Sequence, residues 1–212
     1  EASGGRTARR GPARQPQVAP PSPPTPPRRA DTLAVGVLAL LYGVAYGAVC
    51  LVKYRNFLYR DFDLAIFAQA TDGILRGTLY SSIRGMPWLG DHASLILFLL
   101  APVYALFRNA QTLLLIQTAA SAAGAFAVHR LALAATGRRT AALVFAALYL
   151  MYPALGYVNL FEFHPEALAT ALLLFAFVFA YEGRPRPAVI VAGVALLARE
   201  DVALVVLAFA GH

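Results

Sequence analysis

The chain has 212 residues, of which 59% are hydrophobic and 14% are charged, and its formal net charge is +7. Soluble domains carry about a quarter charged residues. A water-soluble fold of this length would need more polar residues to cover its surface, so the composition excludes an ordinary soluble domain. The basic residues form no stripe with interleaved aromatics, so we expect no nucleic acid as a partner. We therefore predict an integral membrane protein with membrane lipid as its surroundings.

The first 31 residues form a tail that is rich in proline and arginine and contains almost no large apolar side chain. Such a segment cannot offset its ordering entropy by burial, and we predict that residues 1–31 are disordered. The positive-inside rule places this tail in the cytoplasm. Residues 32–212 are assigned to a transmembrane helical domain. The chain begins without Met and ends after an apolar run, so we expect a truncated piece of a longer membrane protein.

Long apolar runs predict the helices that cross the bilayer. A fifth apolar segment, 187–210, is interrupted by three charged residues, and we expect it to be broken there. The four crossings are predicted at 33–52, 111–134, 140–159 and 166–181.

The segment 92–107 is apolar but short, and it contains Pro102. If it crossed the membrane, the arginines at 138–139 and 184–186 would lie outside. If it lies along the outer face, both groups fall on the cytoplasmic side, as the positive-inside rule favours. We predict the second arrangement, with an outer loop and interfacial helices over 53–108. The protein is then a multi-pass protein of the cell membrane with a cytoplasmic N-terminus.

The loop after the first helix carries two neighbouring acids, Asp61 and Asp63. Residues from Phe62 onward have the spacing of a short amphipathic helix, which places Asp63 on its apolar face. A carboxylate there is costly unless it has a partner or a task. The alternative is that one of the two acids only caps the helix.

Two acid–histidine pairs follow. Asp91 and His92 can bind a metal or move protons, or Asp91 can cap the 92–107 helix. Glu162 and His164 precede Pro165, a residue suited to a first helical turn. They form either a solvated turn or a functional site, since ionisable groups at the ends of apolar helices are functional candidates.

The last charged group is Arg199-Glu200-Asp201, inside the apolar segment 187–210. In one straight helix these charges would lie near the bilayer centre, at a cost of several kcal/mol. Either the helix breaks and the triplet reaches an outer cavity, or the charges pair internally. Arg199 is suited to holding a phosphate.

Together these motifs resemble the bacterial predicted membrane proteins of domain-of-unknown-function family 2079. The resemblance covers residues 55–210. Family members typically have Asp where Glu162 stands and Lys where Arg199 stands. Both differences keep the sign of the charge but change the length of the side chain. The motifs that carry the resemblance, in order, are Phe62-Asp63-Leu64, Leu89-Gly90-Asp91-His92, Phe161-Glu162-Phe163-His164 and Arg199-Glu200-Asp201.

That family is in turn similar to the GT-C glycosyltransferase superfamily. The resemblance implies an all-α, polytopic transmembrane bundle with outer-face interfacial helices. It also implies transfer of a sugar from a polyprenyl-phosphate carrier to an acceptor outside the cytoplasm. Asp63 matches the first-loop acid of that superfamily and would act as general base, with Asp61 beside it as a second catalytic candidate.

The remaining charged residues of the motifs are candidates for binding substrate. Among them, Asp91, Glu162 and His164 would orient substrate or bind a divalent metal ion, the one cofactor we expect. The alternative function is non-enzymatic, either a transporter or a subunit of an envelope assembly. The substrate-binding candidates are Asp91, His92, Glu162, His164, Arg199, Glu200 and Asp201.

Overall fold

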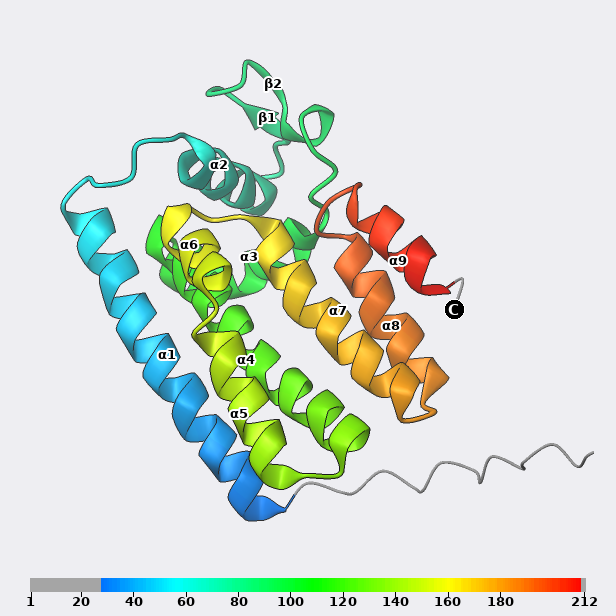
Figure 1. The fold of residues 1–212 in the computed structure, drawn as a ribbon. Helices are drawn as coiled ribbons and strands as arrows, with labels where there is room; N and C mark the ends of the chain where they lie inside the picture. The colour runs from blue at the N-terminus through cyan, green and yellow to red at the C-terminus, as the bar shows by residue number, and fades with distance from the viewer. Residues whose placement is uncertain (1–27, 211–212) are drawn as a thin grey trace, which may run out of the picture.

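The computed structural model describes residues 28–210, which fold into a helical bundle with one small β-hairpin (Figure 1). Strands β1 (Tyr80–Ser81) and β2 (Met86–Pro87) pair antiparallel, and a 3-10 turn, Trp88–Gly90, follows them. The prediction of an all-α membrane bundle is confirmed. Its helices are α1 (Arg29–Arg55), α2 (Asp63–Leu75), α3 (Ile96–Phe107), α4 (Ala110–Thr136), α5 (Arg139–Leu150), α6 (Pro153–Phe161), α7 (Pro165–Tyr181), α8 (Pro185–Leu196) and α9 (Val202–Ala210).

Three segments are long and apolar enough to cross a membrane: α1 and α4, with 27 residues each, and the 23 residues of α5 and α6 together. At 1.5 Å per residue, 27 residues span about 40 Å, which exceeds the roughly 30 Å of a hydrocarbon core. Helix α7 has 17 residues, the lower limit for a crossing. Helix α3 has 12 residues and a length of about 18 Å. It is too short to cross as a straight helix, as predicted for 92–107.

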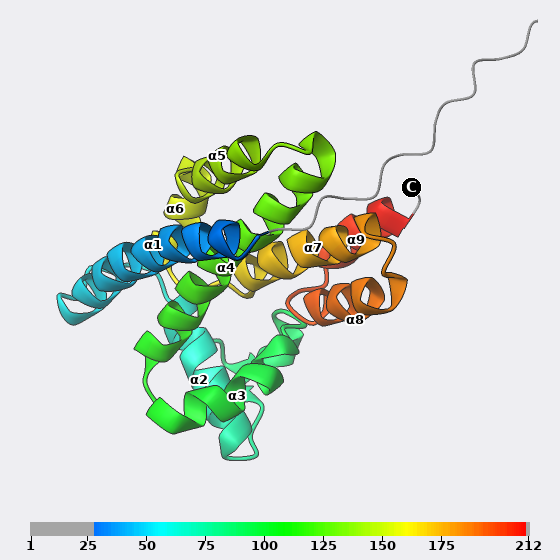
Figure 2. The same cartoon turned by 90° about the horizontal axis from the view of Figure 1, so that it is seen from below.

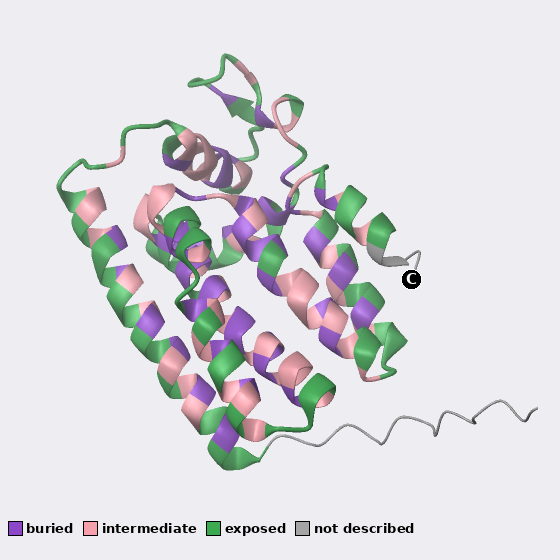
Figure 3. Cartoon of the chain, viewed as in Figure 1, coloured by how far each residue is buried: buried purple, intermediate pink, exposed green. Residues whose placement is uncertain are grey.

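Helix α4 is the centre of the bundle. It packs against α1, α5 and α7, as the view from below also shows (Figure 2). In its most apolar stretch 61% of the residues are buried, against 28% in α1 and 22% in α5–α6. Leucines and valines are exposed along α1 (Figure 3), with Leu33 at 70% and Leu40 at 66%. Such an apolar face is out of place in water and suits a lipid environment.

The arginine-rich turns lie at the end of the bundle where α1 begins. Nη1 of Arg139 lies 3.4 Å from Oδ2 of Asp31 in the first turn of α1. Nearby, Arg130 pairs with Glu182, the residue after α7, at 2.6 Å. Helix α2 and the hairpin lie at the opposite end (Figure 1). The predicted grouping of both arginine turns with the start of the first helix is therefore present, while the side of the membrane that each end faces stays a prediction.

The first helix begins earlier than predicted. Residues 29–31, which we assigned to the tail, form its first turn. The carboxylate of Asp31 accepts a hydrogen bond from the backbone N–H of Arg28 at 2.9 Å, which stabilises this start. Residues 1–27 of the predicted disordered tail lie outside the described residues.

The apolar segment 187–210 is broken as predicted. Helix α8 ends at Leu196, and α9 begins at Val202 and turns back beside α8 (Figure 1). The charged triplet therefore lies in the connecting turn, at the end of the bundle that carries α2, and not inside an apolar helix. The helix breaks, as the first alternative requires, and Arg199 also pairs within the protein, with Glu166 and Asp201, as the second requires. That this turn faces the outer side stays a prediction.

Candidate functional site

The start of α2 is held by Glu162, whose side chain is 1% exposed. Its Oε1 accepts the backbone N–H of Asp61 at 3.0 Å, and its Oε2 accepts that of Leu64 at 2.7 Å. The first N–H groups of a helix have no partner inside the helix, and Phe62, the residue just before α2, makes no side-chain cap. Glu162 thus caps α2 from a distant segment. Burial raises the pKa of Glu162, and the two backbone hydrogen bonds oppose this rise.

Glu162 is held in turn by Gln117, a fully buried residue of α4. Its Nε2 donates to the carbonyl of Glu162 at 2.9 Å, and its Oε1 accepts the backbone N–H of His164 at 2.6 Å. Sequence reasoning missed this residue. The available signal was an amide side chain within an apolar crossing, which needs buried partners.

Asp63 and His164 form an acid–base pair that lines the Arg199 cavity described below. Nε2 of His164 lies 3.2 Å from Oδ2 of Asp63. Its Nδ1 faces the carbonyl of Glu162 at 3.4 Å. A carboxylate can only accept a hydrogen bond, so the contact with Asp63 needs a proton on Nε2 of His164, which then donates to Oδ2. Such a pair can take a proton from a hydroxyl bound beside it.

Arg199 is paired with Glu166 in the first turn of α7. Its Nε also lies 3.6 Å from Oδ2 of Asp201. Both Nε of Arg199 and Oε2 of Glu166 are buried without a hydrogen-bond partner in the described part of the chain. Glu166 was not among the predicted site residues. Glu166 and Arg199 are 33 positions apart, so local sequence gives no sign of the pair.

The turn after α8 is tied to the segment before α3. Nδ1 of His92 lies 3.1 Å from Oε1 of Glu200, whose Oε2 accepts the N–H of Ala93 at 3.0 Å. Hydrogen bonds from its own backbone, from His92 and from Ala93 lower the pKa of Glu200 to about 2. Asp91 ends the 3-10 turn and pairs with Arg84 at 2.7 Å. It does not cap α3, which begins at residue 96.

Two adjoining cavities bring these residues together. The first, of about 80 Å³, contains Arg199 and is called here the Arg199 cavity; its lining is Asp63, Phe67, His92, Ser94, His164, Glu166 and Arg199. The second, of about 130 Å³, is called the Trp88 cavity; its lining is Asp63, Ile66, Phe67, Ala70, Arg84, Trp88, Asp91 and His92.

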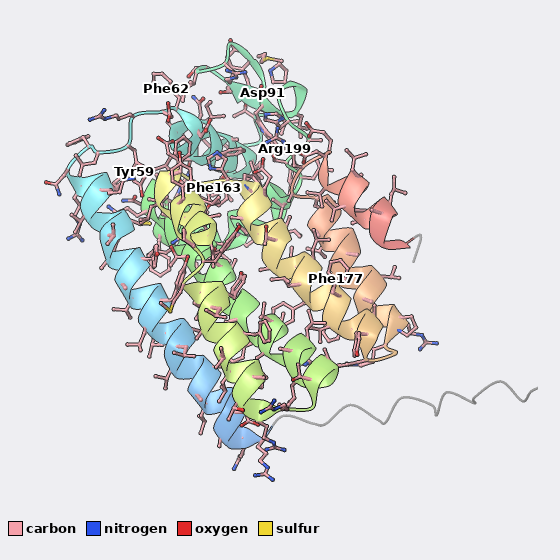
Figure 4. The ribbon with its side chains drawn as sticks, in the orientation of Figure 1. Tyr59, Phe62, Asp91, Phe163, Phe177 and Arg199 are labelled. Carbon is pink, nitrogen blue, oxygen red and sulfur yellow. The ribbon has the colours of Figure 1, made fainter. Side chains whose placement is uncertain are left out.

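Asp63, Phe67 and His92 line both cavities. The labels of Asp91 and Arg199 mark the same end of the bundle, whereas Phe177 lies well along α7 (Figure 4). Five predicted residues, drawn from four separate segments, therefore line this pair of cavities: Asp63, Asp91, His92, His164 and Arg199.

The other predicted residues lie elsewhere. Asp61 lines a separate cavity of about 390 Å³ near the end of α1. Glu162 caps α2, Glu200 holds His92, and Asp201 lines a groove between α7 and α9. The predicted metal ligands are not grouped, because Glu162 is bound to backbone N–H groups and Asp91 to Arg84. Within residues 28–210, no three His, Cys, Asp or Glu side chains are placed to hold a metal ion.

Comparison with known proteins finds a match to one family of proteins. No curated protein and no solved structure matches the chain. The family model described as predicted membrane protein (DUF2079) matches residues 53–211. This match includes α2, the hairpin, both cavities and every helix from α3 to α9. It covers well over half of the chain, and the protein therefore belongs to the DUF2079 family of predicted membrane proteins.

Proposed function

We propose that the protein is a membrane glycosyltransferase that moves a sugar from a polyprenyl-phosphate carrier to an acceptor hydroxyl. One observation carries the proposal: the pair of Asp63 and His164 shares a cavity with Arg199. A proton acceptor and a group suited to a phosphate thus line one small space. The similarity to GT-C enzymes, in which a first-loop acid is essential, points in the same direction.

The proposed reaction needs a base at the acceptor. The acceptor oxygen attacks the anomeric carbon, the bond between that carbon and the phosphate oxygen breaks, and the polyprenyl phosphate leaves. Asp63 takes the acceptor proton, and His164 holds the Asp63 carboxylate in place. A general base must lie within hydrogen-bond reach of the proton that it takes. Asp61 lines another cavity, so we assign this role to Asp63 alone.

Arg199 is the proposed contact of the leaving phosphate. A guanidinium binds phosphate oxygens through several N–H groups, and Nε of Arg199 has no hydrogen-bond partner among the described residues. Glu166, which orients Arg199, also lines the groove of about 410 Å³ between α7 and α9. The rest of that lining is mostly apolar, and includes Leu173 and Leu204. A carrier can thus place its phosphate at Arg199 and its hydrocarbon chain in the groove.

The test is Asp63→Asn in the purified protein, reconstituted with polyprenyl-phosphate sugars and assayed for transfer. The amide keeps the size of the side chain and removes the proton acceptor. We expect a loss of about 10²- to 10⁴-fold in kcat, the usual contribution of a general base, with unchanged expression and melting temperature. Full activity of Asp63→Asn would refute the assignment and favour a transporter or an envelope-assembly subunit.

The matched control is Asp72→Asn. Asp72 lies in the last turn of α2 and pairs with Arg108 at 2.7 Å, and it lines neither the Arg199 cavity nor the Trp88 cavity. This variant removes an ion-paired carboxylate from the same helix without touching the proposed base. We expect it to retain transfer activity within about twofold of the unmodified protein.

A further inference from the structure

We infer that the Trp88 cavity is the acceptor subsite and that it takes a neutral sugar ring. This inference rests on the proposed function, in which Asp63 is the base. Asp63 belongs to both cavities, and Arg199 belongs to only one of them. If the donor phosphate lies at Arg199, the acceptor hydroxyl must approach Asp63 from another direction. The Trp88 cavity is the second cavity that Asp63 lines in the described part of the chain.

The charges around the Trp88 cavity are already paired. Asp91 pairs with Arg84 at 2.7 Å, and Asp63 lies 3.2 Å from His164. His92 lies 3.1 Å from Glu200. An ionic ligand would find no unpaired charge of opposite sign among these side chains. Burying an ion without a partner is costly. The arrangement therefore favours an uncharged ligand that exchanges hydrogen bonds with the carboxylates and the guanidinium.

The walls of the cavity suit a ring more than a chain. Trp88 and Phe67 provide aromatic surface, and Ile66 and Ala70 add apolar contact. The electron-rich face of an aromatic ring attracts the C–H groups on one face of a sugar, while the sugar hydroxyls at the rim reach polar side chains. Trp88 is 3% exposed, and its indole N–H has no hydrogen-bond partner within residues 28–210.

The hairpin holds this lining against α2. Ser81 donates to Oε1 of Gln69 at 2.9 Å, and Nε2 of Gln69 donates to Ser82 at 2.6 Å. The backbone N–H of Trp88 also donates to the carbonyl of Leu79 at 2.9 Å. The hairpin lies beside α2 at the end of the bundle (Figure 1). These bonds fix the wall before a ligand arrives, which lowers the entropic cost of binding.

Trp88 is the one tryptophan of the chain, so its fluorescence reports directly on this cavity. The probes are methyl glucoside, methyl mannoside and methyl galactoside, titrated one at a time without donor. The protein is held in a detergent that contains no sugar, because a maltoside would compete. We expect at least one methyl glycoside to give a saturable change in emission. Sorbitol, an acyclic polyol, should give no saturation over the same concentration range.

Two variants locate the response. Asp91→Asn and Arg84→Gln each alter the polar rim, and we expect each to weaken the apparent sugar affinity at least fivefold. Arg84 lies in the exposed hairpin, so Arg84→Gln is available even if Asp91→Asn does not fold. The control is Asp72→Asn, which breaks an aspartate–arginine contact of the same 2.7 Å length outside the cavity. It should leave the sugar affinity unchanged.

The outcomes separate this inference from the proposed function. Saturable binding in a protein that shows no transfer would support a sugar site in the Trp88 cavity but contradict the transferase and, with it, the acceptor role of that site. Measurable transfer with no saturable response to any methyl glycoside would overturn the subsite alone. A response that sorbitol also saturates, or that both rim variants retain, would overturn it as well. So would tighter binding of glucosamine than of methyl glucoside by tenfold or more, because the site would then select a cation.

Discussion

Single buried polar residues determine where the proposed base lies. Gln117 binds the segment that carries Glu162 and His164, and Glu162 binds the start of α2, which carries Asp63. Both Gln117 and Glu162 are buried, and their partners are backbone groups. A buried polar side chain is stable only with its hydrogen bonds made. Their effect on function is therefore through position, since neither lines the cavity that contains Asp63 and Arg199.

Glu162→Gln tests this positioning role. A glutamine offers one acceptor oxygen for two backbone N–H groups, so one N–H is left unpaired at a cost of roughly 1–3 kcal/mol. We expect a lower melting temperature and a fall in kcat of about 10²-fold, because a displacement of about 1 Å at a reacting group has that effect. Glu182→Gln, at the other end of the bundle, should retain transfer. Unchanged kcat in Glu162→Gln would contradict the role.

The pKa of Glu200 predicts a second residue-level result. It is lowered to about 2 by hydrogen bonds that exist only in the folded protein. A lowered pKa contributes stability that is present above the ordinary pKa of glutamate and is lost as pH falls through the folded value. The stability difference between the unmodified protein and Glu200→Gln should therefore shrink between about pH 4.3 and pH 2. Carboxyl NMR of labelled protein measures the midpoint directly, and a midpoint above 4 would contradict the hydrogen bonds.

At the scale of elements, α4 and α5 meet through a glycine. A Cβ at Gly124 would lie 2.7 Å from Cζ of Tyr149, whose hydroxyl donates to the carbonyl of Ser121 at 3.1 Å. Small residues let membrane helices approach closely. Gly124→Val should therefore destabilise the fold by about 1–3 kcal/mol, the usual cost of overpacking. The control is Gly43→Val in α1, where a Cβ meets nothing within 4 Å. Equal melting temperatures of the two variants would contradict this contact.

The positions of helices could be predicted from the sequence where a single local property, such as the length of an uncharged run, determines them. Uncharged runs near the length of a bilayer crossing predicted α1, α4, α5–α6 and α7, and the charges at Arg199–Asp201 predicted the break after α8. The hairpin was not predicted, because its two strands have two residues each and depend on bonds to Gln69. Helix α3 begins at residue 96 and not at 92, because Ala93 binds Glu200 from a distant turn.

The site was only partly readable, for a related reason. Charged residues at the ends of apolar runs identified Asp63, His164 and Arg199, since charge is costly in lipid. Their pairing was not readable, because Arg199 meets Glu166 across 33 positions and Glu162 meets Leu64 across 98. These contacts depend on how the helices pack in three dimensions. No local pattern in a single sequence predicts that packing.

For the whole molecule, the two ends of the bundle differ in charge and chemistry. The arginine turns and the start of α1 lie at one end, and the cavities lie at the other. The positive-inside rule predicts that the arginine end is cytoplasmic. Ser82→Cys, in the hairpin, should react with a membrane-impermeant maleimide on intact cells. Arg138→Cys should react only after the membrane is permeabilised.

The native Cys50 is buried and gives a low background. Position 162 is unsuited to labelling, because Glu162 is buried inside the protein whichever way the protein is oriented in the membrane. Labelling of residue 138 on intact cells, with protection of residue 82, would invert the topology and place both cavities on the cytoplasmic side.

The cap of α2 also sets an order for biogenesis. Leu64 leaves the ribosome 98 positions before Glu162, and at synthesis rates of about 5–20 residues per second this separation lasts roughly 5–20 s. During that interval the first N–H groups of α2 lack the carboxylate that later binds them. In the predicted topology, α2 lies at the membrane surface until α6 has been inserted into the bilayer. A chain that ends before residue 162 would therefore contain the first crossing but lack the carboxylate that holds the start of α2 and the proposed base.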